Sequence, residues 1–277
     1  AATAVGRAVS LAKLADGRVA TVVPEDLTKP VDVAVDHVSF AYPGGANVLE
    51  DLSVTLEAGT TTALVGTSGA GKSTLTALIA GLVEPTAGSI RVGGVDTSQV
   101  SDTWTAKNVT LLTQDVHLFA GSLREDLSMA AQGATDTDLL RALATVGLDP
   151  DGTQFARLFP KGLDTAVGAG AEDLPPEVEQ QLALARVALS GPKVLILDEA
   201  TAEAGSDATN ALEEAAARIA DGTTALVVAH RLDQAAAADR ILVMDAGHII
   251  EDGTHAQLIA AGGRYAQLFA AWSGGGH

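Results

Sequence analysis

Apolar residues along this chain gather in short runs, and glycine, proline and polar residues separate the runs. A run at 61–65 is short and β-branched, which predicts a buried strand. The same reasoning predicts strands at 31–42, 48–56, 108–113, 192–197 and 223–229, with hairpins within 81–94 and across 241–250. The strands at 31–42 and 48–56 and the hairpin within 81–94 indicate that antiparallel strands lie on both sides of the run at 61–65 in the sequence.

Helical spacing of apolar residues appears between these strands. It predicts helices at 1–14, 74–80, 123–147 and 257–271. Residues 24–30 are polar with two prolines, which predicts a linker, and the glycine-rich residues 273–277 predict a flexible tail. The larger aromatic residues are expected in the core or in contacts: Trp104, Phe119, Phe155 and Phe159.

Composition narrows the classes of function. No run approaches the roughly 18 apolar residues of a membrane span, and residues 1–15 lack the apolar region of a signal peptide, so we expect a soluble fragment. The absence of cysteine excludes disulfides and thiolate metal sites. A formal net charge of −18 opposes broad nucleic-acid binding, so no nucleic-acid partner is expected.

One glycine-rich stretch follows the strand at 61–65 and precedes the helix at 74–80. It fits G-x-x-x-x-G-K-[ST], in which backbone N–H groups and the helix N-terminus hold phosphates. The residues expected to bind nucleotide here are Gly66, Thr67, Ser68, Gly69, Ala70, Gly71, Lys72, Ser73 and Thr74. Lys72 would reach the β- and γ-phosphates and Ser73 would ligate Mg²⁺, whereas a turn without a ligand is the alternative.

Two carboxylates, Asp198 and Glu199, follow the strand at 192–197. After a phosphate loop, this pair is typical of a site where the first carboxylate holds Mg²⁺ and the second acts as general base on water. The alternative is a helix cap after a strand.

Three further polar or aromatic residues lie where a nucleotide site needs them. Tyr42 precedes the phosphate loop and could stack on adenine, or be a strand tyrosine. Gln114 ends the strand at 108–113, where an amide could reach the metal ion or the attacking water, or lie on the surface. His230 follows the strand at 223–229, where it could contact the γ-phosphate, or be a solvated loop histidine.

The order of these motifs resembles the nucleotide-binding domain of ABC transporters, and the phrases at 116–127 and 238–254 are similar to the exporter branch. The resemblance covers about residues 31–270. It implies an α/β P-loop ATPase core, an antiparallel β-subdomain and a helical subdomain near 115–190. It also implies ATP and Mg²⁺ as cofactors, a transmembrane domain as partner, and a place on the cytoplasmic face of the plasma (inner) membrane. Residues 1–30 would be the tail of a transmembrane helix and a linker.

The family's signature, L-S-G-G-Q, is altered here. The corresponding residues are Leu174, Pro175, Pro176, Glu177 and Val178. Proline has no N–H to donate, and glutamate repels an anion, although both residue types suit the first turn of a helix. The segment after Glu199 lacks the family's aspartate, and residues 165–169 lack both glutamates of the family's T-E-V-G-E.

The altered residues all belong to one of two groups: those that would bind the partner's ATP rather than this chain's own. In the family, two domains enclose two ATP molecules, and each site takes its signature from the other chain. Here the residues serving the chain's own nucleotide are intact, and those offered to a neighbour are altered. This predicts one half of an asymmetric, heterodimeric exporter whose partner domain has an intact signature.

Three alternatives remain at this point. The chain could be a regulatory clamp that binds ATP with little or no hydrolysis. A soluble ABC ATPase of nucleic-acid or translation work would usually carry two such domains or a long coiled insertion. A metabolic kinase or GTPase would not need Gln114, Glu199 and His230 in this order.

Overall fold

A computed structural model describes residues 20–28, 30–113, 116–198, 206–229 and 231–274. The chain divides into two compact units. The core unit contains residues 1–111, 193–198 and 222–277, and the helical unit contains residues 112–192 and 199–221. Among the described residues, no helix is long and apolar enough to span a bilayer.

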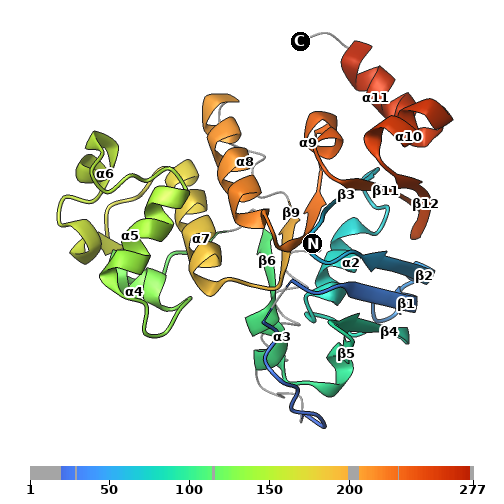
Figure 1. Ribbon diagram of the computed structural model, residues 1–277, viewed down its shortest axis with the longest axis horizontal. Coiled ribbons are helices and arrows are strands. Elements are labelled where there is room, and N and C mark those ends of the chain that lie inside the picture. The colour runs from blue at the N-terminus through green and yellow to red at the C-terminus, as the bar shows by residue number, and fades with distance from the viewer. Residues whose placement is uncertain (1–19, 29, 114–115, 199–205, 230, 275–277) are drawn as a thin grey trace. The chain divides into compact units, whose positions relative to one another are not determined.

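A six-stranded sheet has the order β12-β11-β3-β10-β9-β6 (Figure 1). The strands are β3 (Thr61–Gly66), β6 (Val109–Thr113), β9 (Val194–Asp198), β10 (Thr224–Val228), β11 (Arg240–Asp245) and β12 (His248–Gly253). Strands β9, β10, β3 and β11 pair in parallel, and β12 is an antiparallel edge strand. Buried β9 and β10 are apolar on both faces, as expected for parallel strands covered on both sides.

A second sheet in the core unit is antiparallel, with the order β2-β1-β4-β5. Its strands are β1 (Val33–Ala41), β2 (Asn47–Leu56), β4 (Ala87–Val92) and β5 (Val95–Asp96). The hairpin predicted within 81–94 is β4–β5, which turns at Gly93 and Gly94. One apolar cluster, which includes Leu49, Leu64, Leu78 and Ile196, joins both sheets into a single core.

Helices complete the core unit. They are α2 (Lys72–Ile79), α3 (Asp102–Asn108), α9 (Leu232–Ala236), α10 (His255–Ala261) and α11 (Arg264–Gly274), with a 3-10 turn at Thr97–Gln99. The single helix predicted at 257–271 is wrong, because the chain breaks at Gly262, which adopts φ 65° and ends α10. The predicted tail begins too early, since α11 includes Ser273.

The helical unit contains five helices among its described residues. They are α4 (Leu123–Ser128), α5 (Asp136–Thr145), α6 (Thr153–Leu158), α7 (Pro176–Ser190) and α8 (Ser206–Ala220). A two-stranded ribbon pairs β7 (Gly121–Ser122) with β8 (Ala166–Val167), and a 3-10 turn spans Gly162–Asp164. Phe155 and Phe159 are buried, whereas Phe119 is 52% exposed, which makes it a contact residue rather than a core residue.

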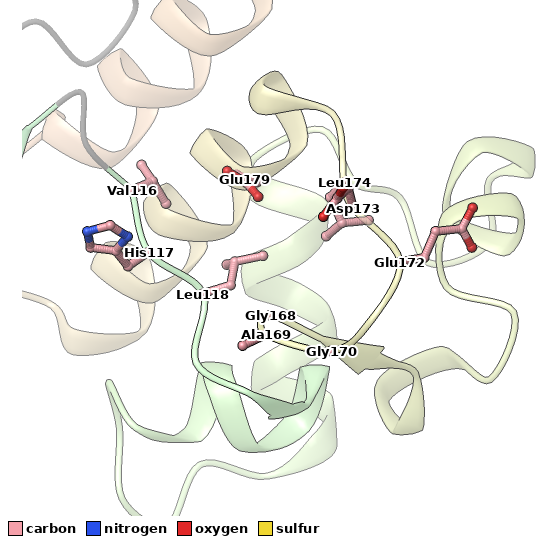
Figure 2. Close-up of a pocket in the computed structure, with 10 residues that line it drawn as sticks. All are labelled: Val116, His117, Leu118, Gly168, Ala169, Gly170, Glu172, Asp173, Leu174 and Glu179. Carbon is pink, nitrogen blue, oxygen red and sulfur yellow. The ribbon is translucent and has the colours of Figure 1, made fainter.

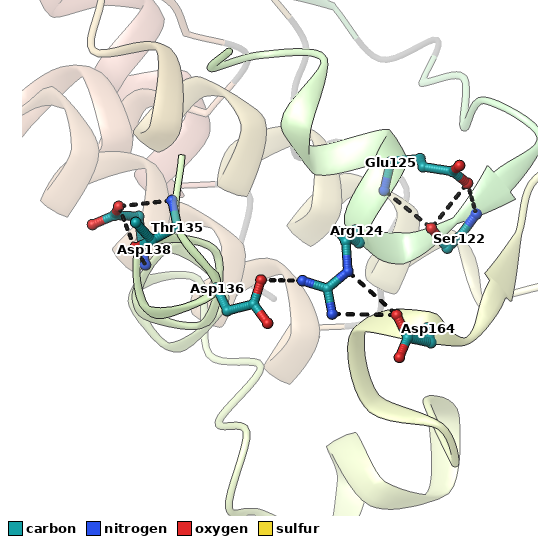
Figure 3. A network of polar contacts seen from close by, with 7 residues as sticks. All are labelled: Ser122, Arg124, Glu125, Thr135, Asp136, Asp138 and Asp164. Atoms are coloured by element: carbon teal, nitrogen blue, oxygen red, sulfur yellow. Dashed lines mark hydrogen bonds and ion pairs between the residues drawn. The ribbon is translucent and has the colours of Figure 1, made fainter. Parts of the chain in front are cut away.

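The continuous helix predicted at 123–147 is also wrong. Two capping boxes start separate helices, one at Ser122 with Glu125 and one at Thr135 with Asp138 (Figure 3). Arg124 on α4 then pairs with Asp136 and Asp164, which fixes α4 to the start of α5 and to the 3-10 turn.

Candidate functional site

The phosphate loop joins β3 to α2 in the core unit. Gly69 and Gly71 have φ of 82° and 102°, a backbone region that L side chains rarely adopt. Gly71 is also packed closely, because a Cβ there would lie 2.7 Å from Leu49 Cδ2. Gly71 is the N-cap residue of α2 and, because it has no side chain, makes no side-chain cap hydrogen bond to the first turn of that helix. This is the arrangement that binds phosphate oxygens.

Lys72 is held against the loop itself. Its Nζ donates to the carbonyl oxygens of Gly66 at 2.8 Å and Thr67 at 3.1 Å. These contacts place an ammonium group inside the loop, next to the start of α2. A positive charge at this point suits a polyphosphate and adds to the dipole of the helix.

Asp198 lies at the end of β9 and is only 9% exposed. Its Oδ2 accepts from Thr76 Oγ1 at 3.3 Å, and the same hydroxyl donates to the carbonyl oxygen of Ser73 at 3.0 Å. Thr76 thereby connects Asp198 to the first turn of α2. The hydroxyl of Ser73 and the carboxylate of Asp198 are oxygen donors of the kind that Mg²⁺ takes, so these residues fit that cofactor.

Tyr42 lies just after β1 and is 39% exposed. Its hydroxyl lies 3.3 Å from Thr74 Oγ1, and its ring meets Phe40 edge-on, with centroids 4.9 Å apart. The structure therefore brings Tyr42 to the helix that follows the phosphate loop. The ring of Tyr42 is partly exposed and is held in place by its contact with Phe40, so its free surface could stack against an adenine ring.

Three of the predicted catalytic residues, Gln114, Glu199 and His230, lie outside the described residues. Strands β6 and β9 end at the residues that precede Gln114 and Glu199. The described part of the site therefore contains the phosphate loop, Tyr42 and Asp198.

Sequence reasoning missed two residues of this site. Thr76 has the contacts given above, and Gly247 donates its N–H to the carbonyl oxygen of Ala70 at 3.0 Å. The position of Thr76, three residues after Ser73 on a helix, was a usable signal. No local pattern indicates Gly247, because its contact crosses 177 residues of sequence.

In the helical unit, the residues predicted to be an altered signature, 174–178, lie at the start of α7. Pro175 is the N-cap residue and Pro176 the first helical residue, with Glu177 and Glu179 in the first turn. The N–H groups of Val178 and Glu179 both donate to the carbonyl oxygen of Pro175, at 2.9 and 3.1 Å. Val178 itself is buried.

A cavity of about 320 Å³ lies beside this helix start (Figure 2). Residues of segments 116–118 and 168–174 line it together with Glu179 of α7. Its charged side chains are carboxylates, from Glu172, Asp173 and Glu179, with His117 on the opposite segment. Such a lining attracts cations and repels phosphate.

A phosphate loop between a strand and a helix, with a buried carboxylate at the end of a second parallel strand of the same sheet, defines a P-loop nucleotide-binding domain. The ABC transporter family model matches residues 49–202. The chain belongs to the ABC transporter family, and the matched domain is that family's ATP-binding domain, an ATPase. The α/β ABC ATPase fold predicted from the sequence is confirmed.

Individual relatives agree with this family. An uncharacterized ABC transporter ATP-binding protein of Bacillus subtilis, YwjA, is 37% identical over 243 residues, which cover 88% of this chain and 42% of the relative. A mycobactin import ATP-binding/permease protein of Mycolicibacterium thermoresistibile, IrtA, is 40% identical over 244 residues, covering 88% and 26%. An ATP-dependent lipid A-core flippase of Bordetella avium is 39% identical over 247 residues, covering 88% and 41%. The chain thus spans less than half the length of these relatives.

Proposed function

We propose that this chain is the ATP-binding and hydrolysing domain of an exporter-type ABC transporter, and that it works as one half of an asymmetric heterodimer. Its own nucleotide would bind at the phosphate loop, with Tyr42 against adenine and Lys72 on the β- and γ-phosphates. Ser73, Asp198 and Gln114 would hold Mg²⁺. Glu199 would activate water, and His230 would contact the γ-phosphate.

The observation that carries the asymmetry is the start of α7. A helix N-terminus binds an anion through its free N–H groups, yet Pro175 and Pro176 have none. Val178 and Glu179 direct theirs to Pro175. Of residues 175–179, only Glu177 is left with an N–H for a ligand, and its own side chain is an anion.

Electrostatics point in the same direction. The cavity beside the helix start presents three carboxylates, and Glu177 adds a fourth acidic group in the first turn of α7. A terminal phosphate brought to this surface by a second chain would meet like charge. We therefore infer that the site completed by this chain for its partner binds ATP weakly or does not hydrolyse it.

The membrane part of the proposal comes from the relatives. Proteins named as ATP-binding/permease proteins are more than twice as long as the matching segment, so we infer a transmembrane domain and a cytoplasmic-face position at the inner membrane for the whole transporter. Residues 1–30 would lead from that domain.

The decisive experiment measures phosphate release from defined pairs of this chain. A signature-restored variant carries Pro175→Ser, Pro176→Gly and Glu177→Gly, while Val178 stays because it is buried. Adding Lys72→Ala to this variant disables its own phosphate loop. Mixing it with the unaltered chain then leaves one complete site, formed by the unaltered phosphate loop and the restored signature.

We expect this mixture to release phosphate at least tenfold faster than the unaltered chain alone, because one charge-assisted contact to phosphate contributes about 1.5–3 kcal/mol. Glu199→Gln in the chain with the intact loop should remove the gain. If the mixture releases phosphate as slowly as the unaltered chain alone, hydrolysis at this chain's own site would be contradicted, and the ATP-binding clamp would be favoured. A fast unaltered chain would contradict the asymmetry.

A further inference from the structure

The turn between β11 and β12 touches the phosphate loop directly. Its two residues, Ala246 and Gly247, both have positive φ, of 45° and 82°, which is the type I′ pattern of a tight hairpin. Gly247 is buried, and its N–H donates to the carbonyl oxygen of Ala70 at 3.0 Å. This hydrogen bond joins the turn to the loop that would hold the nucleotide.

Packing allows almost no movement at this contact. A Cβ on Gly247 would lie 2.3 Å from the carbonyl oxygen of Val48, so β2 closes the turn from the other side. A Cβ on Gly66 would lie 2.3 Å from the carbonyl oxygen of Met244, the last parallel partner of β3 on β11. The base of the loop is thus enclosed by backbone from β2 and β11.

Peptide geometry gives this contact a consequence for binding. A trans peptide is planar, so its C=O and N–H point in opposite directions. Fixing the Ala70 carbonyl toward Gly247 directs the N–H of Gly71 away from the turn. Gly71 is the N-cap of α2, one of the positions whose N–H groups surround phosphate in a loop of this type.

We propose that Gly247 is a positioning residue for the phosphate loop: its N–H holds the Ala70–Gly71 peptide in the orientation that presents the Gly71 N–H to the β-phosphate. This inference rests on the proposed nucleotide-binding function. It assigns to the β11–β12 turn a role in binding di- and triphosphates, and none in binding the nucleoside part.

An amide-to-ester change at Gly247 tests this role, because it replaces the N–H by oxygen and keeps the shape. The chain has no cysteine, so a synthetic segment 238–277 can be joined at position 238 and the ligation cysteine desulfurised back to Ala238 without side products. The control is the same change at Gly262, whose N–H donates to Ile259 at 3.2 Å, at the end of α10.

We expect the Gly247 ester to bind ADP about tenfold more weakly than the unaltered chain, while AMP affinity stays within about twofold. The Gly262 ester should bind both like the unaltered chain. Equal ADP affinity of the Gly247 ester, or equal losses for ADP and AMP, would overturn the inference alone. An unaltered chain that binds no ADP would overturn the proposed function and this inference with it.

Hydrogen exchange decides the matter if the ester does not fold. Thermodynamic linkage is reciprocal: if loss of the Gly247–Ala70 hydrogen bond lowers the ADP affinity by some factor, bound ADP must disfavour opening of that hydrogen bond by the same factor. In the unaltered chain, ADP should therefore slow exchange of the Gly247 amide about tenfold more than that of the Gly262 amide. An equal effect of ADP on both amides would refute the positioning role.

Discussion

His37 on β1 and Asp51 on β2 lie where the β1–β2 pairing is irregular, and both have a φ of 50°. The N–H of His37 donates to Ser53 Oγ at 2.9 Å, and the N–H of Asp51 to Ser39 Oγ at 3.0 Å. Cross-strand serines thus satisfy the backbone where the two residues leave the regular strand conformation. This exchange explains how two residues with side chains tolerate a region that glycine usually occupies.

The side chains of this pair predict a pH effect. The hydrogen bond and the charge of Asp51, 2.6 Å from Nδ1, raise the pKa of His37 above 6.5, and Asp36 adds to the rise. A raised folded-state pKa means that the pair contributes its full stability below pH 6.5. That contribution is lost as the pH rises through the folded-state value.

NMR titration of the His37 ring should show this. Asp51→Asn is expected to bring the pKa back toward 6.5, because it removes the two largest causes of the rise. Asp36→Asn is the matched control and should lower it less, since that carboxylate is 3.8 Å from Nε2. A His37 pKa unaffected by Asp51→Asn would contradict the assignment.

Among the elements of the helical unit, α4 and α7 share a buried ion pair. Asp126 is fully buried, and its Oδ1 accepts from Arg186 at 3.1 Å and from the N–H of Phe119 at 2.9 Å. Arg186 also donates to the carbonyl oxygen of His117 at 3.0 Å. The pair therefore fixes the segment that lines one side of the cavity in Figure 2.

Removing one partner of this pair should destabilise the helical unit strongly. We expect Arg186→Met to cost about 3–5 kcal/mol in urea unfolding followed by circular dichroism, because it leaves a buried carboxylate without its cation. Adding Asp126→Asn should recover at least about 1 kcal/mol, since the amide carries no charge. Arg141→Met, which breaks an exposed pair with Asp138, should cost less than about 0.5 kcal/mol. Equal costs for the two arginine variants would contradict the role of burial.

At the scale of single elements, the sequence predicted those features that depend on residues close together in the chain. The strand at 61–65, the glycine loop and the carboxylate after 192–197 appear in the structure as predicted, because each rests on neighbouring residues. The break between α4 and α5 was readable as well, since Thr135 and Asp138 form a capping box that the continuous helical spacing concealed.

The sequence pattern could not predict contacts between segments that are far apart in the chain. The carbonyl partners of Lys72 depend on how the loop folds back, and the bond from Thr76 to Asp198 joins residues 122 positions apart. The bracing of Ala70 by Gly247 likewise requires β11 to lie beside β3. The roles of Gln114, Glu199 and His230 stay predictions, because they lie outside the described residues.

At the scale of the whole molecule, two features are candidate barriers to pairing of this chain with itself. One is the start of α7, which we propose is an altered signature with too few N–H donors for a second nucleotide. The other is the net charge of −18, which makes two copies repel each other. Salt distinguishes these barriers, because it screens charge over about 10 Å at 0.1 M and does not create donors.

Light scattering of the Glu199→Gln chain with ATP and Mg²⁺ can measure this difference. The substitution blocks hydrolysis, so any ATP-dependent pair would persist. We expect a monomer at 0.1 M and at 0.5 M salt, and a dimer at both once Pro175→Ser, Pro176→Gly and Glu177→Gly restore the signature. If high salt alone produced the dimer, charge would be the barrier, and the proposed asymmetry would lose its support. Because the three substitutions remove only one of the negative charges that set the repulsion, a dimer gained at low salt must come from the donors they add.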